Sequence, residues 1–196
     1  MTWRKPGGFT LVELLFTIAI LVIMLVIAAP SFVDTLDRRR VINATEALVG
    51  QVQQARSVAI ARNEEISIVF DKADDDSWWC SGLTDAASCD CTVTDEDDDD
   101  ACTVGVPAPG STERMLVRTG SDGFNGIDLS AGAFPLTITF EPTRGIRTAP
   151  ADADDEVLEL ESSRGLQTRI AVGLLGRITT CSPSGDSFIG GVKPCN

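Results

Sequence analysis

Residues 9–33 read FTLVELLFTIAILVIMLVIAAPSFV, a stretch in which Glu13 is the one charged residue. About 20 consecutive apolar residues cross a bilayer as a helix, so this stretch predicts a transmembrane helix over 9–33. Arg4 and Lys5 precede it, and the positive-inside rule then places the N-terminus in the cytoplasm and everything after Val33 outside. The apolar stretch is long for a secretory signal peptide, and no small-residue cleavage site clearly follows it. A plain membrane anchor is a second alternative and stays open.

Glu13 is the unusual residue of this apolar stretch. A carboxylate is costly in lipid and needs a partner. Cleavage between Gly8 and Phe9 would supply one, because the new α-amino group of Phe9 would lie about one helical turn away, or could meet Glu13 of a neighbouring chain. The sequence therefore predicts an ion pair between Glu13 and an N-terminal amine.

Residues 8–13 read GFTLVE and are followed by the apolar stretch, a pattern that resembles the class III signal of type IV pilins and pseudopilins. The resemblance implies that a prepilin peptidase cleaves after Gly8, which makes residues 1–8 a leader peptide. It also implies N-methylation of Phe9 and a role for Glu13 in docking the subunit into a helical filament.

Pro30 matches the helix-bending proline of that family. Proline removes one backbone hydrogen bond and kinks a helix. Loss of the leader would remove Arg4 and Lys5, so the formal charge would change from 16 − 29 = −13 to 14 − 29 = −15.

The helix is expected to continue as an amphipathic segment over 34–62. Apolar residues recur there mostly three, four or seven positions apart: Phe32, Leu36, Val41, Leu48, Val52, Ala55 and Ala59. After Glu65 the period changes to two, which predicts strands at 66–70, 136–140, 157–161, 169–172 and 177–179, with 115–118 as a weaker candidate. The predicted fold class is α+β, a pilin-like fold in which a long N-terminal α-helix packs on a largely antiparallel sheet of six or seven strands.

The head, residues 63–196, is expected to carry an exposed acidic insertion at about 71–112, with a second acidic loop over 149–156. The cysteines are read as disulfide candidates of an oxidising compartment: Cys80, Cys89, Cys91, Cys102, Cys181 and Cys195. We expect Cys181–Cys195 to close a C-terminal loop, with two bridges among the other four cysteines, since six allow 15 connectivities. A four-thiolate zinc site is the alternative, and the irregular spacing disfavours it.

The C-terminal half resembles the GspH/FimT group, through ITFEPTRG at 138–145 and the segment 169–181. The sequence at 30–32 and the cysteine content are most like FimT/FimU minor pilins. The resemblance implies a minor type IV pilin that takes part in priming pilus assembly and sits at or near the pilus tip. A GspH-like minor pseudopilin of a type II secretion system is the alternative.

The implied partners are other minor and major pilins, the prepilin peptidase, an inner-membrane assembly platform and membrane lipid before assembly. The implied location is the inner membrane, crossed once, with a periplasmic head that reaches the cell surface in the pilus. The chain has no His, so it has neither a Ser-His-Asp triad nor a two-His zinc site. We expect no enzymatic activity, no cofactor and no metal.

DNA is the alternative partner. Gly176-Arg177 matches the start of a Gly-Arg-x-Arg motif thought to bind DNA in some FimT-type pilins, but Thr179 stands at its second basic position. Arg169 and Lys193 are the other cations of the region. A background charge of −15 would weaken attraction to phosphates. The opposing interpretation pairs Arg177 with Glu159 or Glu161.

Trp78 and Trp79 precede Cys80 and have two interpretations. They could form a ligand platform, or they could pack in the core over a disulfide. The acidic runs lack the ligand spacing of a calcium loop, which favours solvated loops there.

Overall fold

The computed structural model describes residues 8–105, 113–150 and 153–195, without the side chains of 27–31. Residues 1–7 of the predicted leader peptide 1–8, with Arg4 and Lys5, lie outside this range. The chain divides into two compact units, residues 1–37 and 38–196. The helix α1 (Leu11–Arg62) contributes residues to both, and all strands belong to the second unit.

The predicted segments 9–33 and 34–62 form a single helix, which confirms the helical part of the sequence prediction. It ends because Asn63 adopts a positive φ of 56° and the Glu64 N–H donates to the Ala59 carbonyl at 3.3 Å, a left-handed C-terminal cap. Within the described residues, no helix combines the length and hydropathy that a membrane crossing requires. The span expected over 9–33 therefore stays a prediction, as does the bend at Pro30, whose side chain lies outside the description.

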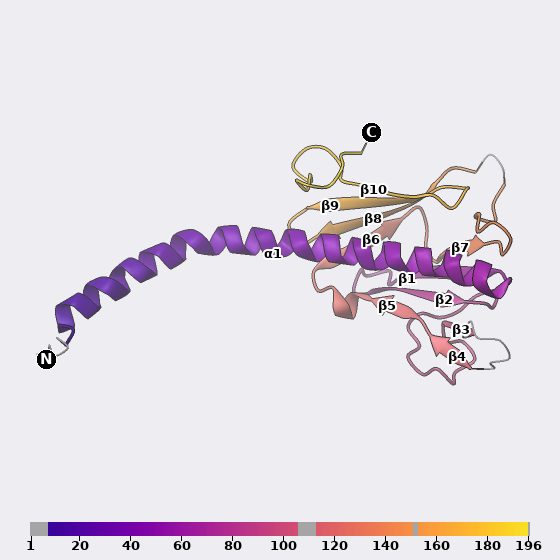
Figure 1. The fold of residues 1–196 in the computed structure, drawn as a ribbon, viewed down its shortest axis with the longest axis horizontal. Helices are drawn as coiled ribbons and strands as arrows, with labels where there is room; N and C mark the ends of the chain where they lie inside the picture. Colours follow the sequence, from indigo (N-terminus) through magenta and orange to yellow (C-terminus); the bar gives the residue numbers. More distant parts are fainter. Residues whose placement is uncertain (1–7, 106–112, 151–152, 196) are drawn as a thin grey trace, which may run out of the picture. The chain divides into compact units, whose positions relative to one another are not determined.

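Two antiparallel sheets of four strands form the head (Figure 1). The first has the order β5-β2-β1-β7, with β1 (Ile66–Lys72), β2 (Trp79–Thr84), β5 (Arg118–Gly120) and β7 (Leu136–Phe140). The second has the order β10-β9-β8-β6, with β6 (Ile127–Ala131), β8 (Glu156–Ser162), β9 (Gln167–Val172) and β10 (Ile178–Cys181). A two-stranded ribbon, β3 (Thr103–Gly105) and β4 (Arg114–Leu116), and a short 3-10 helix, η1 (Ser121–Gly123), complete the described elements.

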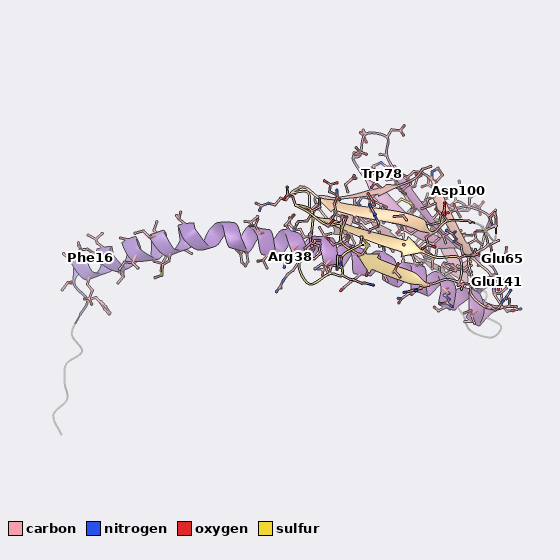
Figure 2. All side chains as sticks on the ribbon, turned by 90° about the horizontal axis from the view of Figure 1, so that it is seen from above. Phe16, Arg38, Glu65, Trp78, Asp100 and Glu141 are labelled. Carbon is pink, nitrogen blue, oxygen red and sulfur yellow. A yellow bond between two sulfur atoms is a disulfide. The ribbon has the colours of Figure 1, made fainter. Side chains whose placement is uncertain are left out.

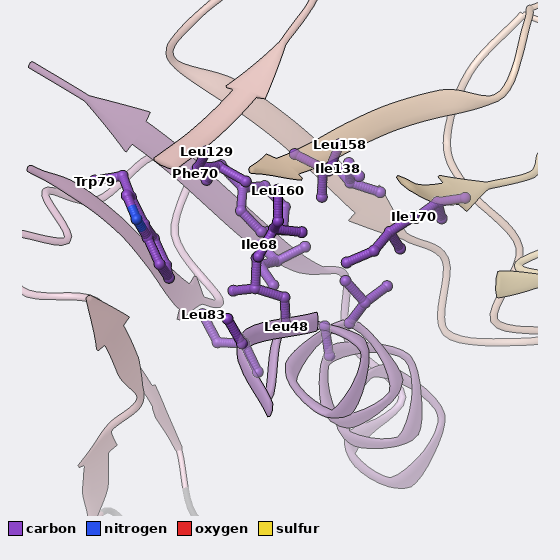
Figure 3. Packing of buried hydrophobic residues seen from close by; sticks show 14 of the residues in the cluster. Leu48, Ile68, Phe70, Trp79, Leu83, Leu129, Ile138, Leu158, Leu160 and Ile170 are labelled. Carbon is purple, nitrogen blue, oxygen red and sulfur yellow. The ribbon is translucent and has the colours of Figure 1, made fainter. Parts of the chain in front are cut away.

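The core lies between the head portion of α1 and both sheets (Figure 3). Leu48 on the helix, Ile68 on β1 and Leu160 on β8 are fully buried and belong to one cluster. The alternation that predicted the strands is the reason: in β9, Thr168, Ile170 and Val172 are buried while the residues between them are half-buried. The structure thus confirms the α+β fold, with more strands than the six or seven expected.

The segment 71–112, expected to be an exposed insertion, is not exposed throughout. It contains β2, in which every residue is buried, and β3. Ser81 occupies a core-facing position of β2, where its hydroxyl donates to the Gln51 side chain of α1. A polar residue at a core-facing position breaks the apolar alternation, so the sequence pattern did not predict this strand. Its partner Gln51 comes within hydrogen-bond distance only in the folded chain. Residues 94–100 are exposed, as the acidic run suggested.

Gly82 of β2 lies against the disulfide of Cys102 and leaves no room for a side chain. A Cβ added there would lie 2.4 Å from both Cβ and Sγ of Cys102, so the disulfide packs directly on the backbone of β2. Overpacking of this kind costs about 1–3 kcal/mol, and we expect Gly82→Ala to lower the free energy of unfolding by that amount. Gly132→Ala is the control, since a Cβ there meets nothing within 4 Å. Denaturant unfolding measures both, and equal stabilities would contradict this packing.

Candidate functional site

The N-terminal end of α1 holds the predicted processing and docking residues. Gly8 and Phe9 precede the helix and are exposed, and Glu13 lies in its first turn. The backbone N–H of Glu13 donates to the Thr10 hydroxyl at 3.2 Å, so Thr10 caps the helix. Thr10-x-x-Glu13 has the spacing of a capping box, which the sequence reasoning did not use. The structure thus shows a capping role for the Thr10 side chain, while the docking role of the Glu13 carboxylate stays a prediction.

Apolar side chains cover the first unit's helix on all sides. Phe9, Leu11 and Phe16 are 81%, 75% and 66% exposed. Every large apolar side chain between Phe9 and Val26 is at least half exposed. Figure 2 shows these side chains projecting from the helix around Phe16. An exposed apolar surface of this extent marks a contact with lipid or with another protein.

Three disulfides tie the head together. The pairs are Cys80–Cys91, Cys89–Cys102 and Cys181–Cys195, the last being the pair favoured from the sequence. The first two interleave along the chain and bury Cys80, Cys91 and Cys102 against β2. Because the acidic residues 94–100 have little apolar surface of their own to bury, these bridges hold that loop to the sheet.

The half-buried carboxylate of Asp85 links the end of α1 to the ribbon of β3 and β4. Asp85 accepts a hydrogen bond from Arg114 Nη2 at 2.7 Å and from the Gly105 N–H at 3.1 Å, and lies 3.8 Å from Arg62 Nη2. Burial alone would raise the pKa of Asp85. The hydrogen bonds from Arg114 and Gly105 and the charges of Arg114 and Arg62 outweigh it and hold that pKa below its usual range.

The lowered pKa of Asp85 makes the stability of the fold depend on pH. A carboxyl whose pKa is lower in the folded state adds stability above the unfolded pKa and loses it as pH falls through the folded one. We expect Asp85→Asn to cost about 1–3 kcal/mol at neutral pH, as for hydrogen bonds to charged groups, with the difference from wild type vanishing in acid. Asp99→Asn, an exposed change in the nearby acidic run, is the control. Unfolding at several pH values measures the effect, and a pH-independent difference would contradict it.

The three cations proposed for DNA contact have different surroundings. Arg169 on β9 forms an ion pair with Glu159, its register partner on β8. Arg177 is exposed just before β10 and lines a cavity with Arg56, whose Nη1 donates to the Gly176 carbonyl at 3.2 Å. Lys193 lines a separate groove. One interpretation paired Arg177 with Glu159 or Glu161, whereas in the structure Glu159 pairs with Arg169 and Glu161 accepts from Gln167.

That groove lies between the head portion of α1 and the C-terminal loop. Its volume is about 530 Å³, and Ile42 and Val49 of α1 face Thr180, Val192 and Lys193 across it. Thr45 and Thr168 also line it, and their hydroxyls are hydrogen-bonded to each other at 2.6 Å. β10 is an edge strand of its sheet and contributes Thr180 to the groove, and an edge strand can accept a strand from another chain.

Comparisons with known proteins follow the same division of the chain. A prokaryotic N-terminal methylation motif matches residues 3–29, and the family described as type II transport protein GspH matches residues 44–176. The second match includes 71–112, which the sequence resemblance left out. A search of curated proteins found no match.

Two solved structures are similar to this chain, both crystal structures of the type IV minor pilin FimU of Pseudomonas aeruginosa. The first has 19% identity and a TM-score of 0.46, covering 75% of this chain and 95% of that one. The second, from another crystal form, has 15% identity and a TM-score of 0.40, covering 72% and 95%.

Proposed function

Because the chain belongs to the family of type II transport protein GspH, whose members are structural proteins and not enzymes, we propose that it is a minor type IV pilin that primes pilus assembly and lies at or near the pilus tip. The observation that carries the proposal is the N-terminal helix. It combines a methylation motif with apolar side chains exposed on all sides. Such a surface is covered by lipid before assembly and by neighbouring pilin helices afterwards.

The proposed location follows from the same segment. Processing after Gly8 and methylation of Phe9 would leave a subunit anchored by the apolar helix in the inner membrane, with residues 38–196 in the periplasm. The three disulfides support an oxidising compartment for this head. In the pilus, the groove beside β10 would receive a neighbouring minor or major pilin.

A pseudopilin role in type II secretion is the second candidate, favoured by the description of the matching family. It would rest on the same processing of the N-terminal segment. DNA uptake has less support, because Arg169 is paired with Glu159, and Arg177 and Lys193 line different cavities.

Deletion of the gene tests the proposal, with surface pili counted by electron microscopy and the gene restored in trans. We expect pili to disappear and to return on complementation. Retained pili together with lost protein secretion would replace the proposal by the pseudopilin role. Retained pili with lost DNA uptake would replace it by DNA capture.

A further inference from the structure

A cavity of about 740 Å³ lies at the start of β2, on the head. Three chain segments line it, within 76–79, 121–128 and 161–163. Its walls combine aromatic rings, serine hydroxyls, an amide and carboxylates. Binding sites for small ligands have this composition, an apolar wall with a few polar groups that fix the orientation.

Trp78 forms the open aromatic wall. Its side chain is 36% exposed, and Figure 2 labels it on the outer side of the head. The next residue, Trp79, is 2% exposed, stacks on Phe124 with ring centroids 6.1 Å apart, and donates from Nε1 to the Ile127 carbonyl at 2.8 Å. The Trp78 carbonyl accepts from the Ala73 N–H at 3.0 Å. The backbone is thus fixed on both sides, and Trp78 presents a preorganised apolar surface.

Carboxylates form the opposite side of the cavity. Asp128 on β6 and Glu161 on β8 are register partners, so their side chains stand next to each other. Lys72 Nζ lies 2.8 Å from both Asp128 and Asp76 and holds them in place. Burial lowers the pKa of Lys72, but its hydrogen bonds and attraction to these two carboxylates raise it further, so the ammonium stays charged. Glu161 accepts from the Gln167 amide at 2.8 Å.

From this arrangement we propose that the cavity binds a neutral or amino-substituted saccharide. The apolar C–H face of a pyranose ring lies on Trp78. Its hydroxyls donate to the carboxylates of Asp128 and Glu161, which are the stronger acceptors, and exchange hydrogen bonds with Asn125. The inference goes beyond pilus assembly, because it assigns the head a contact with glycans on a surface.

The charge of the cavity sets its specificity. Asp76, Asp122, Asp128 and Glu161 line it, so uronic and other acidic sugars are repelled. A simple organic cation could use Trp78 through a cation–π contact. Lys72 already forms ion pairs with Asp76 and Asp128. Their remaining lone pairs can accept hydrogen bonds from hydroxyl groups.

Titration of the full chain with oligosaccharides tests the proposal. The protein is kept in a polyoxyethylene detergent without sugar groups, and binding is followed by calorimetry. The probes are the neutral tetramers of glucose and mannose, the glucosamine tetramer, the galacturonate tetramer and choline. We expect at least one neutral or amino tetramer to bind at millimolar concentration or below, and galacturonate to give no signal.

Trp78→Ala is expected to weaken that binding about tenfold, the effect of losing a stacking contact. Phe188→Ala is the matched control, because Phe188 is 37% exposed and does not line this cavity. Glu161→Gln keeps the shape and should weaken binding through the hydrogen bonds alone. Unchanged affinity in Trp78→Ala, binding of choline alone, or no binding by any of the sugars would overturn the proposal.

Discussion

Replacing Gly8 with leucine is expected to abolish removal of the leader peptide. Gly8 is exposed and lies directly before the exposed Phe9, and a Cβ at Gly8 would meet nothing within 4 Å in the free chain. The substitution therefore leaves the fold intact, and its effect arises where the peptidase must approach the bond between residues 8 and 9. Mass spectrometry of membrane fractions should find residues 1–8 still attached and no methyl group on Phe9.

Gly7 provides a matched control for this substitution, since it is a neighbouring glycine one position further from the bond. Gly7→Leu should leave cleavage largely intact. Normal processing of Gly8→Leu would refute the leader assignment and, with it, the predicted N-methylation of Phe9. The measurement is independent of whether the mature protein belongs to a pilus or to a secretion machine.

Replacing Glu13 with alanine is expected to remove the protein from assembled filaments while leaving it in the membrane. Removing one partner of a buried ion pair costs about 3–5 kcal/mol, because the other charge stays buried alone. A loss of that size corresponds to a factor of more than one hundred in the association constant. Immunoblots of sheared pili, compared with whole cells, measure the incorporated fraction.

Two further substitutions separate the helix cap at Thr10 from the charge of the Glu13 side chain. Thr10→Ala removes the hydrogen bond from the Glu13 N–H and costs about 0.5–2 kcal/mol of helix stability, but it keeps the carboxylate. Glu13→Gln keeps the capping geometry and removes the charge. If the ion pair decides docking, Glu13→Gln fails like Glu13→Ala and Thr10→Ala assembles. Wild-type incorporation of Glu13→Ala would contradict the docking role.

Local patterns explain what sequence reasoning found. The helix is one uninterrupted segment whose apolar spacing is visible along the chain, and α1 runs from Leu11 to Arg62 close to the predicted bounds. The strands predicted at 66–70, 136–140 and 169–172 carry large apolar residues at every second position and correspond to β1, β7 and β9. Thr10 could have been found too, because the capping-box spacing is written in the sequence.

The missed elements depend on contacts between distant residues. β2 reads WCSGLT, and its core-facing Ser81 is accommodated by Gln51, while Gly82 admits the disulfide of Cys102. The pairing of four closely spaced cysteines follows from which of them face β2, which spacing cannot give. The ion pair between Arg169 and Glu159 likewise joins two strands, and the sequence did not indicate it.

The sequence alone determined that this chain is a pilin-like protein with a long helix, because processing motifs and helical periodicity are properties of consecutive residues. Only the tertiary structure decided how the head is built, since strand order, disulfide connectivity and ion pairs depend on residues far apart in the chain. Trp78 illustrates the difference: the sequence left it as platform or core. In the folded chain, Trp79 is buried and stacks on Phe124. Trp78 lines an open cavity that forms where three separate segments of the chain meet.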